Sequence, residues 1–274
     1  MKPRHSRSEP ARHPSREKAL SEHVRIEREG AVLASTLARP ERRNAITVAM
    51  YATLADAVES ASADPSIRVV SFRGQGQDFA AGNDLGDFLN ALPRDTDEIP
   101  VWRLLRALAK CETPIVAAVH GNCVGIGTTM LLHCDLVIAE EGARFSMPFV
   151  DLALVPEAAS SLLFPRIAGR RRAARYLLLG EPFGVDEAFD VGLISHRATA
   201  GGLDQALANV VQSLLSKPPQ ALRQTQQLLR LGARDEILER MREEGARFSE
   251  RLSSPEVKEA ITAFFEKRKP NFGV

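Results

Sequence analysis

The sequence predicts an α/β protein made of stacked ββα units with a parallel sheet, followed by a helical C-terminal region. Two observations support this fold class. Up to about residue 200, short apolar runs typical of strands buried on both faces alternate with helical segments. From Leu203 onward the pattern is helical throughout, with helices expected at 203–215, 218–231, 237–252 and 255–268. We therefore expect three parts: an N-terminal arm over 1–20, a ββα core domain over 21–200 and a helical region over 201–274.

The N-terminal arm differs in composition from the rest of the chain. Its basic side chains are Lys2, Arg4, Arg7, Arg12 and Arg16, and they lie among Ser, Pro and His. So little apolar surface indicates a disordered basic tail. An Arg-rich arm with serines is also typical of a mitochondrial targeting segment, but three prolines and two glutamates argue against the amphipathic helix that such a segment needs.

The first half of the core contains a hairpin and two helices. Residues 24–29 and 31–38 alternate apolar and polar side chains around Gly30, which predicts the hairpin. Thr47 is a good N-cap for a helix that runs to about residue 62, and 67–72 is a buried strand. An acidic loop bounded by prolines, 93–100, precedes a helix at 101–109.

The segment Pro114–Leu132 organises the centre of the chain. An apolar strand at 115–119 leads through Gly121, Gly125 and Gly127 into a helix expected from Thr128. Free backbone N–H groups at such a turn can hold an anion or the oxyanion of an enolate. A glycine-rich turn without a binding role is equally compatible with these residues alone.

The second half of the core continues the alternation. We expect a strand at 136–139, a short extended segment at 145–148 and a helix that opens at 155–161. Helices are expected at 170–179 and 185–191, and a further strand at 192–195.

Composition excludes several classes of protein. A net charge of +1 and 5% aromatic residues give no support for a nucleic-acid partner. Three separated cysteines without a C-x-x-C motif predict reduced, packed thiols in a cytoplasmic location, and no His/Cys pair has the spacing of a metal site. No apolar run is long enough to span a membrane, so we expect no membrane partner.

Several short motifs together resemble the enoyl-CoA hydratase/isomerase (crotonase) family. They are R-P-E-R-R-N-A-I at 39–46, F-A-A-G-N-D-L at 79–85, A-A-V-H-G-N-C-V-G-I-G at 117–127, C-D-L-V-I-A at 134–139, G-L-I at 192–194 and F-F-E-K-R-K-P-N-F at 264–272. They occur in the order and at the spacing of the family, and the likeness covers roughly residues 24–272.

The resemblance implies a spiral of ββα units with a helical C-terminal region that mediates trimer formation. It also implies an acyl-CoA thioester as substrate, no cofactor beyond the coenzyme A of that substrate, no metal, and a homotrimer or a dimer of trimers.

The shared chemistry of the family is a thioester carbonyl held by two backbone N–H groups. Matching the motifs assigns these donors to Asn83 and Ile126. Small neighbours allow close backbone approach, and two donors aimed at an enolate oxygen supply roughly 3 kcal/mol each. The substrate-binding residues implied around them are Ala81, Gly82, Asn83, Asp84, Leu85, Gly125 and Ile126.

The hydratases of the family use two glutamates, and both are absent here. Their positions carry Thr129 and Phe149. Adding water to a double bond is a task normally shared by two carboxylates, so these residues argue against hydration.

One carboxylate remains in the right neighbourhood, Glu157. Its surroundings, M-P-F-V-D-L-A-L-V-P-E-A-A-S-S-L-L-F-P, resemble the peroxisomal-type Δ3,Δ2-enoyl-CoA isomerases, in which a P-E-G-C-S-S segment carries a single catalytic glutamate. Apolar neighbours would raise the pKa of Glu157 toward a value useful for a base. A carboxylate that only stabilises a helix N-terminus is the alternative. Ala158-Ala159 replaces the Gly-Cys of that branch.

Other polar residues receive lesser roles. Asp84 is expected to cap the following helix, Asp151 is a turn residue or a second acid, and His120 is expected to be structural. The resemblance implies Arg42, Arg43, Lys267 and Lys269 as partners of the coenzyme A phosphates. Phe264 and Phe265 are expected to pack on the adenine or to belong to the core.

The sequence therefore predicts an enoyl-CoA isomerase with Glu157 as its base. A hydratase or another crotonase-type reaction, such as thioester hydrolysis or dehalogenation, is the second hypothesis. A non-catalytic acyl-CoA-binding protein is the third.

Overall fold

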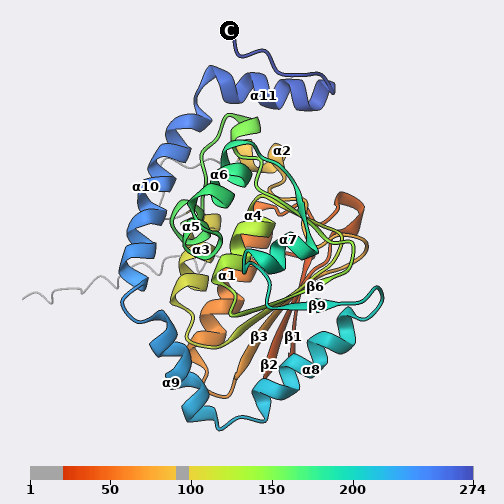
Figure 1. Ribbon diagram of the computed structural model, residues 1–274, viewed down its shortest axis with the longest axis vertical. Coiled ribbons are helices and arrows are strands. Elements are labelled where there is room, and N and C mark those ends of the chain that lie inside the picture. The colour runs from red at the N-terminus through yellow and green to blue at the C-terminus, as the bar shows by residue number, and fades with distance from the viewer. Residues whose placement is uncertain (1–20, 91–98, 274) are drawn as a thin grey trace, which may run out of the picture.

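The computed structural model describes residues 21–90 and 99–273. A central sheet lies between two layers of helices, with α8 (Leu203–Leu215) on one face and α1 (Val48–Ala63) and α3 (Pro100–Lys110) on the other (Figure 1). This is the predicted α/β class. The arm predicted over 1–20 and most of the predicted acidic loop 93–100 lie outside the described residues.

The central sheet has the strand order β1-β2-β3-β4-β6-β9. Its strands are β1 (Val24–Glu29), β2 (Val32–Leu37), β3 (Val69–Gly74), β4 (Ile115–Val119), β6 (Leu136–Glu140) and β9 (His196–Ala198). Only β1 and β2 are antiparallel, and they form the predicted hairpin; the remaining pairs are parallel. Crossover helices connect the parallel strands, as such a sheet requires.

The two faces of the sheet follow the alternation of side chains along each strand. Val70 and Phe72 of β3 face the large core under α1 and α3. Val69 of β3 and Val116 of β4 face the smaller cluster that α8 covers. Because both faces of β4 are buried, that strand is apolar throughout, as the sequence indicates, whereas β3 also carries Ser71 and Arg73.

Helix α1 begins as predicted. The Thr47 side chain accepts a hydrogen bond from the Met50 N–H at 3.3 Å, which satisfies one free donor of the first turn. The short helix α2 (Leu85–Asn90) follows, and the carboxylate of Asp84 accepts from the Asp87 N–H at 3.1 Å, so the predicted cap is confirmed.

A second sheet positions the glycine-rich segment. Its strands are β5 (Asn122–Val124), β7 (Arg144–Ser146) and β8 (Phe183–Gly184). The helix after β5 is α4 (Ile126–Thr129), which continues as the 3-10 helix η3 (Met130–His133). It therefore begins two residues before the predicted start at Thr128.

The remaining helices agree with the pattern to within a few residues. They are η1 (Pro40–Arg42), η4 (Val150–Leu152), α5 (Ser160–Ala168), α6 (Arg170–Leu178), α7 (Val185–Asp190), α9 (Pro219–Arg230), α10 (Arg234–Leu252) and α11 (Pro255–Glu266). Residues 201–273 carry no strand. The division into domains at residue 200 stays a prediction.

Two expectations for local structure are wrong. Residues 192–195 do not form a strand, because Gly192 is left-handed (φ +77°) and the Leu193 N–H bonds back to Ala188 O, which ends α7 with a turn. The helix expected to open at 155–161 begins only at Ser160, which places Glu157 in the loop before it.

No helix in the part of the chain that the structure describes combines the length and apolar character needed to cross a membrane. The three cysteines are free; Cys111 and Cys123 are buried and Cys134 is half-buried.

Candidate active site

The two predicted glycine motifs lie side by side. Residues 80 and 123 pair as a parallel bridge, and the Val124 N–H donates to Ala80 O at 2.9 Å. The V-G-I-G segment is also bound to β7 of the second sheet, since the Gly125 N–H donates to Ser146 O at 2.9 Å. These backbone bonds bring the F-A-A-G-N-D-L and V-G-I-G segments together although about 40 residues separate them.

The loop that follows η1 supports the first motif from the opposite side. The Ile46 N–H donates to Gly82 O at 2.8 Å, and the Asp84 N–H donates to Ile46 O at 3.0 Å. The side-chain amide of Asn44 is fully buried and donates to Gln75 O and Asp78 O. This parallel bridge uses Gly82 O and the Asp84 N–H, so it leaves the N–H of the residue between them, Asn83, unused.

Both motifs require glycine where they approach each other. A Cβ on Gly82 (φ +91°) would lie 3.2 Å from Val124 O. A Cβ on Gly125 (φ +56°) would lie 4.0 Å from the Gly82 Cα. The residues that directly precede Asn83 and Ile126 are therefore in near contact, and glycine permits this backbone conformation.

The N–H groups of Asn83 and Ile126 make no hydrogen bond to any described residue. Ile126 is the first residue of α4, so its N–H has no acceptor within the helix. Two free N–H groups on adjacent loops can both donate hydrogen bonds to one carbonyl oxygen, which is the arrangement that the sequence motifs predict.

Glu157 is buried, with 1% of its surface exposed. Its Oε1 has no hydrogen-bond partner among the described residues. Burial, together with the nearby charge of Glu244 on α10, raises the pKa of Glu157 to about 8. A carboxyl group with such a pKa can exchange a proton with a weak carbon acid near neutral pH.

The turn after Glu157 is strained. Ala158 (φ +62°) and Ala159 (φ +54°) are both left-handed, a conformation that costs an L-residue roughly 1–2 kcal/mol. These two alanines stand where the isomerases that this segment resembles have Gly-Cys. A glycine at position 158 would adopt the left-handed conformation without strain. His133 Nε2 lies 2.8 Å from Ala158 O, and burial lowers the pKa of His133 to about 4, so the neutral ring donates this bond.

Tyr51 of α1 connects the two sides of the site. Its hydroxyl donates to Asn83 Oδ1. Burial and then the charge of Glu157 raise its pKa, so the hydroxyl stays protonated and lies near the glutamate. Tyr51 could not be singled out from the sequence, because a buried aromatic residue on a helix usually belongs to the core.

The two positions where hydratases carry glutamate are filled by uncharged side chains. Thr129 is completely buried, and its Oγ1 has no partner within the described residues. Phe149 is also buried. Neither side chain can activate a water molecule as a carboxylate does.

Some expected site residues lie beside the loops and others do not. Ala81, Asp84 and Leu85 are half-buried next to Asn83, and the Arg39 guanidinium holds Asp84 at 2.7 Å. His120 is structural as expected, with Nε2 at 2.9 Å from Gly76 O. Asp151 is exposed on η4 and its carboxylate lies against Gly180.

The structure does not test the residues expected to contact coenzyme A. Arg42 is exposed on η1, and Lys267 is exposed at the end of α11, which lies at one end of the molecule away from α4 (Figure 1). Arg43 pairs with Asp78 at 2.8 Å. Phe264 and Phe265 are about 60% exposed (60% and 62%), so the core alternative for them is wrong.

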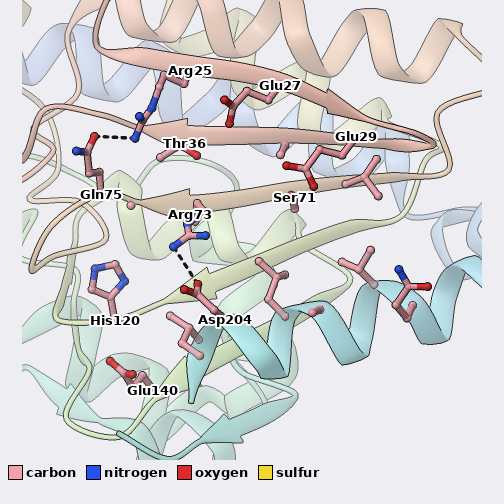
Figure 2. Close-up of a pocket in the computed structure, with 18 of the residues that line it drawn as sticks. Arg25, Glu27, Glu29, Thr36, Ser71, Arg73, Gln75, His120, Glu140 and Asp204 are labelled. Carbon is pink, nitrogen blue, oxygen red and sulfur yellow. Dashed lines mark hydrogen bonds and ion pairs between the residues drawn. The ribbon is translucent and has the colours of Figure 1, made fainter. Parts of the chain in front are cut away.

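A separate groove of about 830 Å³ lies between α8 and the outer face of β1, β2 and β3 (Figure 2). Its two arginines are bound within the protein: Arg73 pairs with Asp204 at 2.9 Å, and Arg25 donates to Gln75 Oε1 at 2.8 Å. The groove contains none of the predicted substrate-binding residues and lies on the other face of the sheet from α1.

Comparisons with known proteins agree with the motifs. A family model described as enoyl-CoA hydratase/isomerase matches residues 27–274. The chain is 31% identical over 255 residues to the mouse protein named enoyl-CoA delta isomerase 3, peroxisomal, covering 91% of this chain and 80% of that one. It is 32% identical over 251 residues to an Escherichia coli 2,3-dehydroadipyl-CoA hydratase, covering 90% of this chain and 97% of the relative.

A solved structure shares the fold. The enoyl-CoA hydratase/isomerase of Pseudoalteromonas atlantica T6c superposes with a TM-score of 0.87 at 40% identity, covering 92% of this chain and all (100%) of that chain. An isomerase and a hydratase match about equally well, so the site must distinguish the two reactions.

Proposed function

The chain belongs to the enoyl-CoA hydratase/isomerase family, and on that premise we propose that it is a Δ3,Δ2-enoyl-CoA isomerase. One observation carries the choice of reaction. Among the described residues, Glu157 is a buried carboxyl group with an oxygen that has no hydrogen-bond partner, and it lies near Tyr51, which binds Asn83, while the two hydratase positions hold Thr129 and Phe149.

The proposed reaction moves one proton. The thioester oxygen of a 3-enoyl-CoA accepts hydrogen bonds from the Asn83 and Ile126 N–H groups, which makes the C2 proton more acidic. Glu157 takes that proton, and the negative charge spreads from the thioester oxygen over C2 and C4 as a dienolate. The same carboxyl group then returns the proton to C4, which leaves the double bond between C2 and C3 and regenerates the base. No water is consumed, so a second carboxylate is unnecessary.

The buried carboxylate nearest in effect to Glu157, Glu244, does not provide a hydratase pair. Its two oxygens accept hydrogen bonds from the backbone N–H groups of Ala159 and Ser161, at 2.6 and 2.9 Å. A carboxylate engaged in this way is poorly suited to orient a water molecule for attack.

Tyr51 and the phosphate partners complete the proposal. The Tyr51 hydroxyl holds the Asn83 side chain by a hydrogen bond, which keeps the loop with the Asn83 N–H in position. Arg42 and Lys267 are proposed to meet the phosphates of coenzyme A, and the assembly is proposed to be a homotrimer or a dimer of trimers.

The test follows the absorbance of the conjugated thioester when purified protein is mixed with 3-enoyl-CoA. We expect turnover by the wild-type protein and a loss of about 10²- to 10⁴-fold for Glu157→Gln, the contribution usual for a general base. Asp151→Asn serves as the control, because Asp151 is an exposed carboxylate that lies against Gly180, and it should keep the wild-type rate.

Three outcomes would contradict the proposal. A Glu157→Gln variant with wild-type rate would exclude this residue as the base. Substantial hydration of crotonyl-CoA would favour a hydratase. Binding of acyl-CoA in calorimetry without turnover of any enoyl-CoA would favour a non-catalytic protein.

A further inference from the structure

The turn that carries Glu157 is held mainly by one side chain from a distant helix. Glu244 of α10 reaches it across 85 residues of sequence and binds it twice, with Oε2 on the Ala159 N–H and Oε1 on the Ser161 N–H. Both N–H groups belong to the free donors at the start of α5, where a carboxylate is favoured.

The two hydrogen bonds to Glu244 fix the conformation of the turn. Ala158 and Ala159 are left-handed without the help of glycine, so the surrounding contacts must hold them in place. Besides Glu244, these contacts are the His133 bond to Ala158 O and the Ser160 N–H bond to Glu157 O at 3.0 Å. Of these three contacts, only that of Glu244 connects another helix to the residues on the α5 side of the turn, Ala159 and Ser161.

Glu244 is itself held rigidly. It is 5% exposed, and Arg240, one turn earlier on α10, donates to Ser161 Oγ at 3.1 Å. The next residue, Gly245, lies against the ring of Trp102 on α3, where a Cβ would be only 3.3 Å from Cζ2. Trp102 also packs edge-on against Phe248, with ring centroids 6.2 Å apart. This packing fixes where α10 lies along α3, and it therefore fixes the position of the Glu244 carboxylate.

We propose that Glu244 is a positioning residue for catalysis: through its two backbone hydrogen bonds it holds the left-handed Ala158–Ala159 turn and thereby aims the Glu157 carboxyl group at the substrate. This inference rests on the proposed role of Glu157 as the base. It adds a C-terminal helix to the machinery that positions the base, whereas the motifs that carry the two donors and Glu157 all lie in the first 160 residues.

The charge of Glu244 gives the proposal a measurable signature. The groups that face Glu157 or its turn are Tyr51 on α1, His133 on η3, and Glu244 and Arg240 on α10. Tyr51 and His133 are neutral near pH 7 because burial raises the pKa of the first and lowers that of the second. Burial raises the pKa of Glu244 to about 7, while its hydrogen bonds from Ser161 and Ala159 act against that rise. Glu244 is therefore mostly ionised over the pH range in which Glu157 ionises, and its charge adds to the effect of burial on Glu157.

The experiment replaces Glu244 by Gln, which keeps the size of the side chain but removes its charge and offers an acceptor to only one of the two N–H groups. We expect the plateau kcat at high pH to fall about tenfold with KM for the enoyl-CoA changed less than twofold, because the contacts to the thioester lie on other loops. The ionisation of Glu157 should move to lower pH by roughly one unit, since a like charge has been removed.

The ionisation is followed directly by the carboxylic C=O band in infrared difference spectra between low and high pH, assigned by its absence in Glu157→Gln. This readout needs no turnover, so it separates the present inference from the proposed function: a wild-type protein without isomerase activity would overturn the latter and leave the titration measurable. The matched control is Glu250→Gln, an exposed glutamate on the same helix, which should change neither kcat nor the band.

A Glu157 titration and a plateau kcat that stay at wild-type values in Glu244→Gln would overturn the proposal. If that variant fails to fold, as judged by the fluorescence of Trp102, Glu244→Asp decides. The shorter side chain keeps the charge but cannot span both N–H groups, so kcat should fall while the Glu157 titration stays in place. A wild-type kcat in Glu244→Asp would exclude the positioning role.

Discussion

The loops around Asn83 and Ile126 are held by backbone hydrogen bonds between neighbouring strands, whereas the turn at Glu157 is held by side chains from distant helices. On the first side, glycines at 82 and 125 adopt left-handed backbone without strain and the pairing partners are close in the fold. On the second side, alanines at 158 and 159 adopt the same conformation at a cost, and Glu244 and His133 hold them there. The donors for the substrate oxygen are thus part of the sheet scaffold, and the base depends on tertiary packing.

This difference matters for chemistry. Donors that stabilise developing charge work best when they need no rearrangement, which a strand-bonded loop provides. A base needs a proton affinity far from that of a free carboxylate, and here burial and the charge of Glu244 on a distant helix supply it.

The largest expected effect concerns the burial of Glu157. Its pKa in the folded protein is about 8, against an ordinary value of 4.5, so the folded state holds this proton more tightly than the unfolded chain. Stability is therefore lost as pH rises through this window, by about 3 kcal/mol between roughly pH 5 and 8. Urea unfolding at both pH values should show a smaller loss in Glu157→Gln than in the wild type. The part that remains comes from Glu244, because burial raises its pKa to about 7.

The control for this pH dependence is Glu259→Gln. Hydrogen bonds from Arg268 lower the pKa of Glu259 to about 2, so its contribution to stability is complete above about 4.5 and does not change as pH rises further. If Glu157→Gln keeps the full decline of the wild type, Glu157 is ionised in the folded protein at neutral pH and the account of its environment is wrong.

The second effect tests the loops around Asn83 and Ile126, which backbone hydrogen bonds between strands hold in place. Gly82→Ala would place a Cβ 3.2 Å from Val124 O on a residue with φ +91°. The two loops must separate, so the donors no longer converge, and we expect kcat/KM to fall by 10²-fold or more, about 3 kcal/mol in the barrier. Gly142→Ala is the control, because this glycine is also left-handed but its added Cβ would meet nothing within 4 Å.

Both Gly82→Ala and Gly142→Ala should lose some stability from backbone strain, and only the first should lose activity. Equal loss of activity in both variants, measured with the same enoyl-CoA, would mean that the close approach of the two glycine loops has no special role.

The third effect tests the strain on the glutamate side. Ala159→Gly relieves a left-handed alanine but removes one buried methyl group, and these terms, each about 1 kcal/mol, should nearly cancel. Ala173→Gly in α6 removes an equally buried methyl group from ordinary helical backbone, which should cost about 2 kcal/mol. Equal unfolding free energies for the two variants in urea titrations would show that the turn is not strained.

The sequence predicted the strand-bonded side well. The alternation of apolar strands and helices gave the order of the elements, and the glycines marked the places where two backbones approach. Thr47, Asp84 and His120 have the local roles that their types and positions indicate. These features depend on neighbours in sequence or on strand pairing, and both leave a pattern that can be read in the chain.

The other side could not be predicted in the same way. Nothing near Glu244 indicates that it binds the turn after Glu157, because the contact spans 85 residues and depends on how α10 packs against Trp102. Tyr51 likewise looks like a core residue of an apolar helix. The left-handed alanines contradict local preference, which is the sign of a conformation that tertiary contacts impose.

The smallest expected effect distinguishes two adjacent threonines, both completely buried. Thr128 Oγ1 donates to Cys123 O within the glycine loop at 2.5 Å, whereas Thr129 Oγ1 has no partner among the described residues. Thr128→Val should cost about 1 kcal/mol in urea unfolding and disturb the loop. Thr129→Val should be neutral or slightly stabilising, with kcat within about threefold of wild type, because an unpaired buried hydroxyl is replaced by a methyl group. A large loss of activity in Thr129→Val would show that the hydroxyl contacts the substrate, and the position that a hydratase fills with glutamate would then be a working part of this site.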